Sequence, residues 1–119
     1  GALGRWAVPL AAVVRVEPLP HPLPVPDLLP PLMGLALLAG RRVLLADLDG
    51  LAAETAPRQP DRPGHAVLLR HFPLALVVDR AETIATVAVH MRRGVLADGT
   101  VLLDVDRLAA KARVGGFGP

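Results

Sequence analysis

The amino-acid sequence predicts an all-β domain with a short helix near its C-terminal end. Short apolar runs rich in Val and Leu alternate with Pro and Gly at intervals typical of strands and turns. Asp98-Gly99 is a two-residue sequence that favours a tight hairpin turn. Residues 42–53 recur in a slightly shorter form at 100–110, and both copies run from an apolar strand through Asp into Leu-Ala-Ala. This internal echo indicates two related β units, each ending in a strand and a turn.

The expected elements are bounded by residues that break regular structure or favour turns. The expected strands are residues 6–8, 13–16, 34–38, 42–48, 65–70, 74–78, 84–89, 95–96 and 101–105. The first two are expected at sheet edges, because Pro lacks the N–H that an inner strand donates. Gly40 and the pair Phe72-Pro73 are expected to form turns between neighbouring strands. Asp106 is expected to N-cap a helix that runs through Arg113.

Two segments are expected to lie outside the strands. Residues 18–31 hold seven prolines in fourteen positions, a composition that favours an extended and rigid connector. Residues 53–64 are polar and rich in Pro, which favours a surface loop.

Length and composition favour one soluble domain over residues 1–119. Hydrophobic residues make up 52% of the chain and charged residues 20%, which is too apolar for disorder. The longest apolar stretch, residues 32–46, is interrupted by Gly and Arg, whereas a membrane-spanning helix needs roughly 20 mostly apolar residues. We therefore expect a cytoplasmic protein with no direct membrane insertion.

The charge pattern gives only a weak indication of a polyanionic partner. The formal net charge is +2, the arginines are paired at most as Arg41-Arg42 and Arg92-Arg93, and aromatic residues make up 3% of the chain. A nucleic-acid interface usually shows a basic stripe or an aromatic stacking platform. Nucleic acid is therefore not the expected partner, although a small β-barrel that binds nucleic acid is the alternative function.

The residue types needed for most hydrolytic chemistry are missing. The chain has no Ser, Cys, Asn or Tyr, which excludes a Ser or Cys nucleophile within it. The histidines, at positions 21, 65, 71 and 90, match no compact metal-ligand spacing. The pairs Asp47 with Asp49 and Asp104 with Asp106 are expected to serve turns and caps, and Asp79-Arg80 a surface ion pair. We expect no enzyme, no cofactor and no metal.

A set of short motifs follows along the chain in a recognisable order. They are Arg5-Trp-Ala-Val-Pro-Leu, Pro24-Val-Pro, Gly34 followed by Gly40, Asp47-Leu48, Leu76-Val-Val-Asp-Arg80, and Asp98-Gly with Leu102-Leu-Asp-Val-Asp-Arg-Leu108. In this order they resemble the CheW family of bacterial chemotaxis coupling proteins over about residues 5–110. The resemblance implies one domain built from two small SH3-like β-barrels packed together. It also implies a non-catalytic adaptor that couples chemoreceptor cytoplasmic tips to the regulatory domain of a CheA-type histidine kinase.

Two departures from the family pattern bear on partners. The family's Asn-Leu-Arg-Gly signature stands here as residues 37–40, Leu-Leu-Ala-Gly, without the polar residues associated with receptor contact. The first strand of the family is represented only by residues 1–4, Gly-Ala-Leu-Gly. An incomplete sheet leaves unpaired backbone groups at an edge, so self-association as a homo-oligomer is expected.

The expected partner site lies where the signature falls, and burial in the core is the alternative for Leu35 to Leu38. It comprises Leu35, Leu37, Leu38, Ala39, Gly40 and Arg41. In one extended strand Leu37, Ala39 and Arg41 would share a side, unless a turn at Gly40 resets the register. That side would offer a small apolar patch with a cation at its rim, suited to an amphipathic helix. Because Ala39 replaces the expected Arg, binding is expected to depend weakly on salt.

Overall fold

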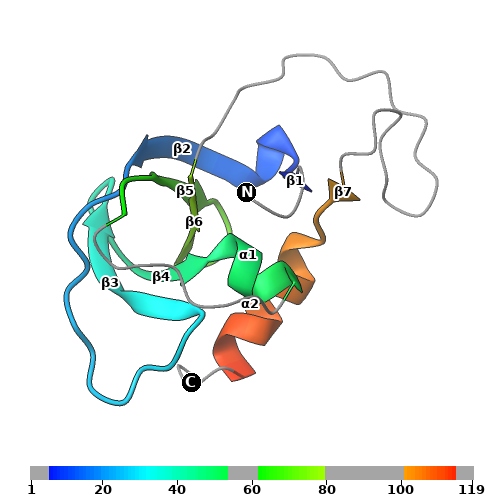
Figure 1. Ribbon diagram of the computed structural model, residues 1–119. Coiled ribbons are helices and arrows are strands. Elements are labelled where there is room, and N and C mark those ends of the chain that lie inside the picture. Colours follow the sequence, from blue (N-terminus) through cyan, green and yellow to red (C-terminus); the bar gives the residue numbers. More distant parts are fainter. Residues whose placement is uncertain (1–5, 54–61, 80–100, 115–119) are drawn as a thin grey trace.

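The centre of the molecule is one five-stranded β-sheet. The structure is a computed structural model that describes residues 6–53, 62–79 and 101–114. The strands are β2 (Val13–Pro18), β3 (Leu32–Leu38), β4 (Arg41–Asp47), β5 (His65–Leu69) and β6 (Leu74–Val78), in the spatial order β2-β5-β6-β4-β3 (Figure 1). Neighbours are antiparallel except β4 and β6, which run parallel. The predicted strands at these five places are confirmed, and β2 is an edge strand as predicted.

β3 and β4 form a hairpin with a turn at Gly40, as the sequence predicts, and the turn has two residues. Leu38 pairs with Arg41, so only Ala39 and Gly40 lie between the strands. Both have left-handed backbones, with φ angles of 49° and 73°. Two left-handed residues in a two-residue loop match the right-handed twist of the strands that they join. The turn therefore fixes the register of the hairpin.

A short helix follows β4 where the sequence led us to expect the end of a strand and a loop. This helix, α1, spans Leu48–Ala53 and begins directly after β4. β5 starts at the end of the sheet where β4 ends, because Asp47 pairs with Val77 and His65 with Val78. Helix α1 therefore begins the connection at that end, and β5 returns the chain so that β6 can run parallel to β4. The β5–β6 hairpin that follows is antiparallel with a turn over residues 70–73, as predicted.

Apolar side chains are buried on both faces of the sheet. On β4, Val43 and Leu45 point to one face, and Leu44 and Ala46 to the other. β5 and β6 divide their side chains in the same way because successive residues of a strand face opposite sides. The leucines and valines at the centre are fully buried, each contributing about 1.5–3 kcal/mol. The sequences of β4, β5 and β6 therefore lack the alternation of apolar and polar residues that is typical of a strand with one exposed face.

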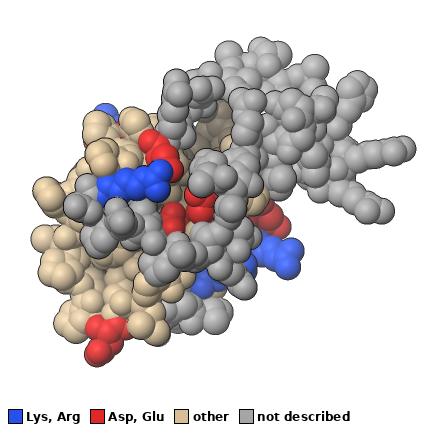
Figure 2. Space-filling model, in the orientation of Figure 1, with Lys and Arg blue, Asp and Glu red and all other residues tan. Residues whose placement is uncertain are grey.

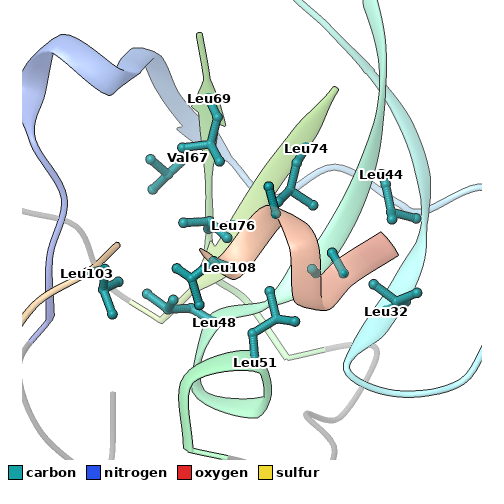
Figure 3. Close-up of a cluster of buried hydrophobic side chains, with 13 residues drawn as sticks. Leu32, Leu44, Leu48, Leu51, Val67, Leu69, Leu74, Leu76, Leu103 and Leu108 are labelled. Atoms are coloured by element: carbon teal, nitrogen blue, oxygen red, sulfur yellow. The ribbon is translucent and has the colours of Figure 1, made fainter. Parts of the chain in front are cut away.

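One face of the sheet is covered by two helices. The second helix, α2, spans Val105–Val114 and contributes Leu108 and Ala112 to a buried cluster shared with the sheet and α1. Figure 3 shows Leu108 within this cluster. Its N-cap is Asp104, whose Oδ1 accepts a hydrogen bond from the backbone N–H of Arg107 at 3.2 Å. The helix is thus confirmed, but it is capped two residues before the predicted Asp106.

The opposite face forms a second core inside the curvature of the sheet. Its members come from four strands and include the small residues Ala36, Ala66 and Ala75, all at most 4% exposed. Small side chains let strands of a strongly curved sheet approach across its concave side. The concave face is filled by the sheet itself, together with the half-buried Leu19 and Met33.

A small parallel pair of strands lies beside the main sheet. β1 (Trp6–Ala7) pairs with β7 (Val101–Leu102), and the backbone N–H of Leu103 donates to Ala7 O at 2.8 Å. Trp6 Nε1 donates to Asp49 Oδ1 at 2.9 Å, which ties this pair to α1. A 3-10 turn, η1 (Leu10–Ala12), leads from β1 into β2.

The connector between β2 and β3 touches the free edge of β3 at one point. Leu23 forms an isolated antiparallel bridge with Leu35. The rest of residues 19–31 forms no helix or strand and has turns at 26–27 and 30–31, so the connector is not extended throughout as predicted. Among the described residues the sheet does not close further than this single bridge. The chain is therefore mostly β with a C-terminal helix, as predicted, and its curled sheet stays open.

The internal echo, the recurrence of residues 42–53 at 100–110, is also visible in the structure, but its two units end differently from the prediction. In the first copy β4 leads into α1, and in the second β7 leads into α2. Each unit therefore ends in a strand followed by a helix and not in a strand followed by a turn. Leu-Ala-Ala forms helix in both copies, and the two helices pack together.

Several expected features fall outside the described residues. They are the shortened first strand at 1–4, the strand at 84–89, the strand at 95–96 and the Asp98-Gly99 turn. Across the described ranges, no helix has the length and apolar character needed to cross a membrane.

Candidate functional site

The hairpin that carries the predicted partner site divides its side chains between two faces. Leu35 is half-buried and Leu37 is 71% exposed, whereas Leu38 is buried on the concave face. Leu37 lies opposite Arg42 and Leu38 opposite Arg41. The two-residue turn therefore resets the register, so Leu37 shares its face with Arg42 and not with Arg41. The six predicted residues are adjacent in space but do not form one surface.

An exposed leucine from the connector joins this face. Leu23 pairs directly with Leu35, and directly paired residues of antiparallel strands present their side chains on the same side. Leu23 is 62% exposed. Leu23, Leu35 and Leu37, the edge leucines, thus form an apolar strip along the outer edge of β3. Sequence reasoning did not include Leu23, because no local pattern places residue 23 beside residue 35.

The backbone at this edge is open beyond the bridge. The N–H of Leu23 donates to Leu35 O at 2.7 Å, and the N–H of Leu35 donates to Leu23 O at 3.0 Å. Backbone groups two residues apart point to the same edge, so the N–H and C=O of Leu37 also face outward. Within the described part of the chain, no strand pairs with Leu37 there. The strip thus combines exposed leucines with backbone groups ready to pair.

The surroundings of the edge leucines carry little charge. Asp27 is the only Asp, Glu, Lys or Arg between Glu17 and Arg41. In Figure 2 the lower left of the molecule, where β3 and the connector lie, is mostly surface without Lys, Arg, Asp or Glu. Leu29 is also 67% exposed on the connector, but it takes no part in the bridge. Exposed leucines in surroundings with little charge on a small domain often mark a protein-binding site.

The bridge depends on a glycine in β3. A Cβ on Gly34 would lie 2.6 Å from Leu23 O and 3.0 Å from Pro22 Cβ, and its φ is +138°. Only glycine allows both this backbone and this close approach. The pairing register of β3 with β4 also shifts between Leu32 and Gly34. Gly34 therefore positions the connector against β3 and so brings Leu23 to the edge.

Arg41, the only charged residue of the predicted site, is engaged within the molecule. Its Nη1 donates to Leu69 O at 3.1 Å and its Nη2 to Phe72 O at 3.2 Å. These hydrogen bonds hold the β5–β6 turn against the β3–β4 hairpin. Arg41 therefore has a structural role whatever it contributes to binding.

The aspartates that the sequence analysis assigned to turns, caps and an ion pair make contacts within the fold. Asp47 is 6% exposed at the end of β4, and its N–H donates to Pro31 O at 2.8 Å. Asp49 accepts from Trp6, as described above, and Asp106 lies in the first turn of α2. Asp79 pairs with Arg62 at 2.8 Å, an exposed contact worth under ~1 kcal/mol.

Possible metal ligands do not gather in the described parts of the chain. No group of three or more His, Asp or Glu side chains lies close enough there to hold an ion. His90 and Arg80 lie outside the described residues.

Comparison with known proteins adds no assignment to this geometry. No protein-family model and no curated protein matches the chain.

Proposed function

We propose that this chain is a non-catalytic adaptor that works through protein–protein contacts made at the outer edge of β3. The observation that carries the proposal is the strip of edge leucines beside an open backbone edge. A partner strand or helix that covers Leu23 and Leu37 would remove apolar surface from water. An extended partner would also pair with the N–H and C=O of Leu37.

The resemblance to the CheW family suggests which partners to test first. We propose that the adaptor couples a chemoreceptor cytoplasmic tip to the regulatory domain of a CheA-type histidine kinase, or to a related regulator, in the cytoplasm. The order of the motifs from Trp6 to Leu108 supports this assignment. The strong curvature of the sheet and the Leu23–Leu35 bridge fit one SH3-like barrel. In this proposal β1 and β7 belong to the second barrel.

The experiment measures binding of the full chain to each of these two domains by calorimetry. Leu37→Asp places a charge within the edge leucines and should weaken binding by about tenfold or more, because a desolvated carboxylate costs more than 1.4 kcal/mol. Leu29→Asp is the matched control, since Leu29 is equally exposed but lies away from the bridge. It should bind as the unaltered chain does.

A second variant tests the turn itself. Ala39→Asp keeps the fold, because Ala39 is exposed with a left-handed backbone that Asp adopts more readily than most residues. An unchanged melting temperature with weaker binding would include the turn in the interface. Failure of the unaltered chain to bind either domain would refute the chemotaxis assignment. Equal binding by the Leu37 and Leu29 variants would move the interface away from β3.

A further inference from the structure

One end of the sheet brings together Arg70 and the distant pair Arg41-Arg42. Three segments meet there: residues 10–13 at the start of β2, residues 37–42 around the β3–β4 turn, and residues 69–74 around the β5–β6 turn. We call these three segments the basic end. Their charged residues are Arg41, Arg42 and Arg70, and none of their residues is Asp or Glu. His71 is exposed in the same turn as Arg70.

Two of these guanidinium groups are fixed in place by neutral acceptors. Arg70 Nε donates to Ala11 O at 3.0 Å, and its Nη2 donates to Val13 O at 3.2 Å. Arg41 similarly uses the carbonyls of Leu69 and Phe72. A backbone carbonyl orients a guanidinium without neutralising it, so each side chain keeps its full positive charge. The basic end therefore presents preorganised cations with donors left for an anion.

The acidic residues lie toward the opposite end of the sheet. Asp47 is the last residue of β4, Asp79 follows the last residue of β6, and Asp49 lies in α1. Glu17 pairs with Ala66, near the same end. Arg62 pairs with Asp79 at that end, whereas the basic end holds three arginines and no acidic residue, so an approaching anionic group is attracted to the basic end.

Exposed leucines flank the arginines. Leu37 is 71% exposed on the β3 side, and Leu10 is 66% exposed on the β2 side. From β3 to β2 there are four steps between neighbouring strands, at most roughly 19 Å at about 4.8 Å a step. An extended segment of about six residues covers this span.

We propose that the basic end binds an acidic amphipathic peptide segment of the partner. Its carboxylates meet Arg42, Arg70 and Arg41, and its apolar side chains cover Leu37 and Leu10. The proposal rests on the adaptor function and adds the chemistry of the partner. A peptide fits better than nucleic acid, because the only aromatic residue in the three segments is the half-buried Phe72. The proposal implies that binding weakens as the salt concentration rises. This differs from the weak salt dependence expected from the sequence, which rested on residue 39 alone.

The probe is a fluorescein-labelled peptide of alternating Glu and Leu, measured by anisotropy with the full chain. The neutral control peptide has Gln in place of every Glu. Oligo-deoxythymidine of similar length is the nucleic-acid control. The acidic peptide should bind at low salt and weaken about fivefold or more between 50 and 300 mM salt, because exposed ion pairs are screened. The neutral peptide should bind at least about tenfold more weakly.

Two charge reversals locate the site. Arg42 is exposed, so Arg42→Glu should preserve the fold and weaken binding of the acidic peptide by about tenfold. Arg107→Glu is the matched control, because Arg107 is an exposed residue of α2 outside the three segments. It should change the affinity by less than about twofold.

Several results would overturn this proposal. They are absence of acidic-peptide binding, equal binding of the neutral peptide, equal effects of the two charge reversals, and stronger binding of the oligonucleotide. The adaptor function and the acidic-peptide site can each be refuted independently of the other. Suppose that both chemotaxis domains bind, that binding requires Leu37, and that neither salt nor the Arg42 substitution changes it. The adaptor function would then be supported and the acidic-peptide site refuted. If the acidic peptide binds through Arg42 but neither domain binds, the basic end stands without those partners.

Discussion

Gly34 is the residue whose replacement should most directly loosen the candidate site. It has a backbone conformation that side chains with a Cβ rarely adopt, and it lies against the carbonyl of Leu23. Gly40 has a left-handed backbone as well, with φ +73°, but no atom lies within 4 Å of a Cβ built there. Comparing substitutions at the two glycines therefore separates the destabilisation caused by the backbone angle from that caused by the close approach.

We expect Gly34→Ala to lower the free energy of unfolding by about 2–4 kcal/mol, because backbone strain and the clash with Leu23 O add. Gly40→Ala should cost about 1–2 kcal/mol, the price of a left-handed backbone alone. Urea denaturation measures both values. Leu23 should also lose its protected N–H in hydrogen exchange in the Gly34 variant. Equal destabilisation by the two substitutions would mean that the connector does not depend on this close approach.

Single residues in turns were also the most predictable part of the site from sequence. Gly40 marked the turn between two strands because glycine is favoured where φ is positive. The faces of Leu37 and Arg41 were not predictable without the length of that turn. A two-residue turn places Leu37 opposite Arg42, whereas a turn one residue longer would have changed the pairing.

Among the secondary-structure elements, strands were predicted better than helices. The five strands of the sheet have β-branched or leucine-rich runs between turn residues, which are local signals. Helix α1 has only six residues and contains Gly50, so its local propensity is low. A Cβ on Gly50 would lie 2.7 Å from Pro31 Cβ, so the helix packs closely on a residue distant in sequence. Its stability comes from this packing and was not visible in its own residues.

Helix α2 offers a test of which aspartate begins it. Asp104→Ala should lower the free energy of unfolding by about 1 kcal/mol, because the backbone N–H of Arg107 loses its side-chain acceptor. Asp106→Ala should cost a few tenths of a kcal/mol, the value of an exposed carboxylate in the first turn. Thermal denaturation at neutral pH compares the two. A larger effect at Asp106 would favour the cap predicted from the sequence over the cap in the structure.

At the scale of the whole molecule, the features that matter for binding come from long-range topology. The edge leucines join residue 23 to residues 35 and 37, and the basic end joins three segments separated by more than twenty residues each. No periodicity or spacing in the sequence encodes such neighbours. The arginines are scattered along the sequence, but the order of the strands in the sheet brings Arg41, Arg42 and Arg70 to one charged surface.

Within residues 6–53, 62–79 and 101–114, the sheet has two free edges that differ in their capacity to pair with a second molecule. The outer edge of β2 ends in Pro18, which has no N–H, and its register with β5 is irregular between Val13 and Arg15. Both features hinder the addition of another strand. The edge of β3 beyond Leu35 has neither protection, and Leu37 is exposed beside it. Self-association, predicted from the sequence, is therefore expected at β3.

We expect the full chain to form a weak dimer at high concentration through the edge of β3, since one unprotected edge can pair with its symmetric copy. Leu37→Lys should keep the chain monomeric, because a lysine on an edge strand opposes pairing. Leu29→Lys adds the same charge elsewhere on the connector and should leave the dimer unchanged. Light scattering over a concentration series measures the mass of each. A partner that uses the same edge would compete with the dimer, so adding it should release monomers into a complex of one copy each. A mass that stays monomeric for the unaltered chain at every concentration would mean that the edge is covered in solution, and the partner would then have to displace that cover before it could bind.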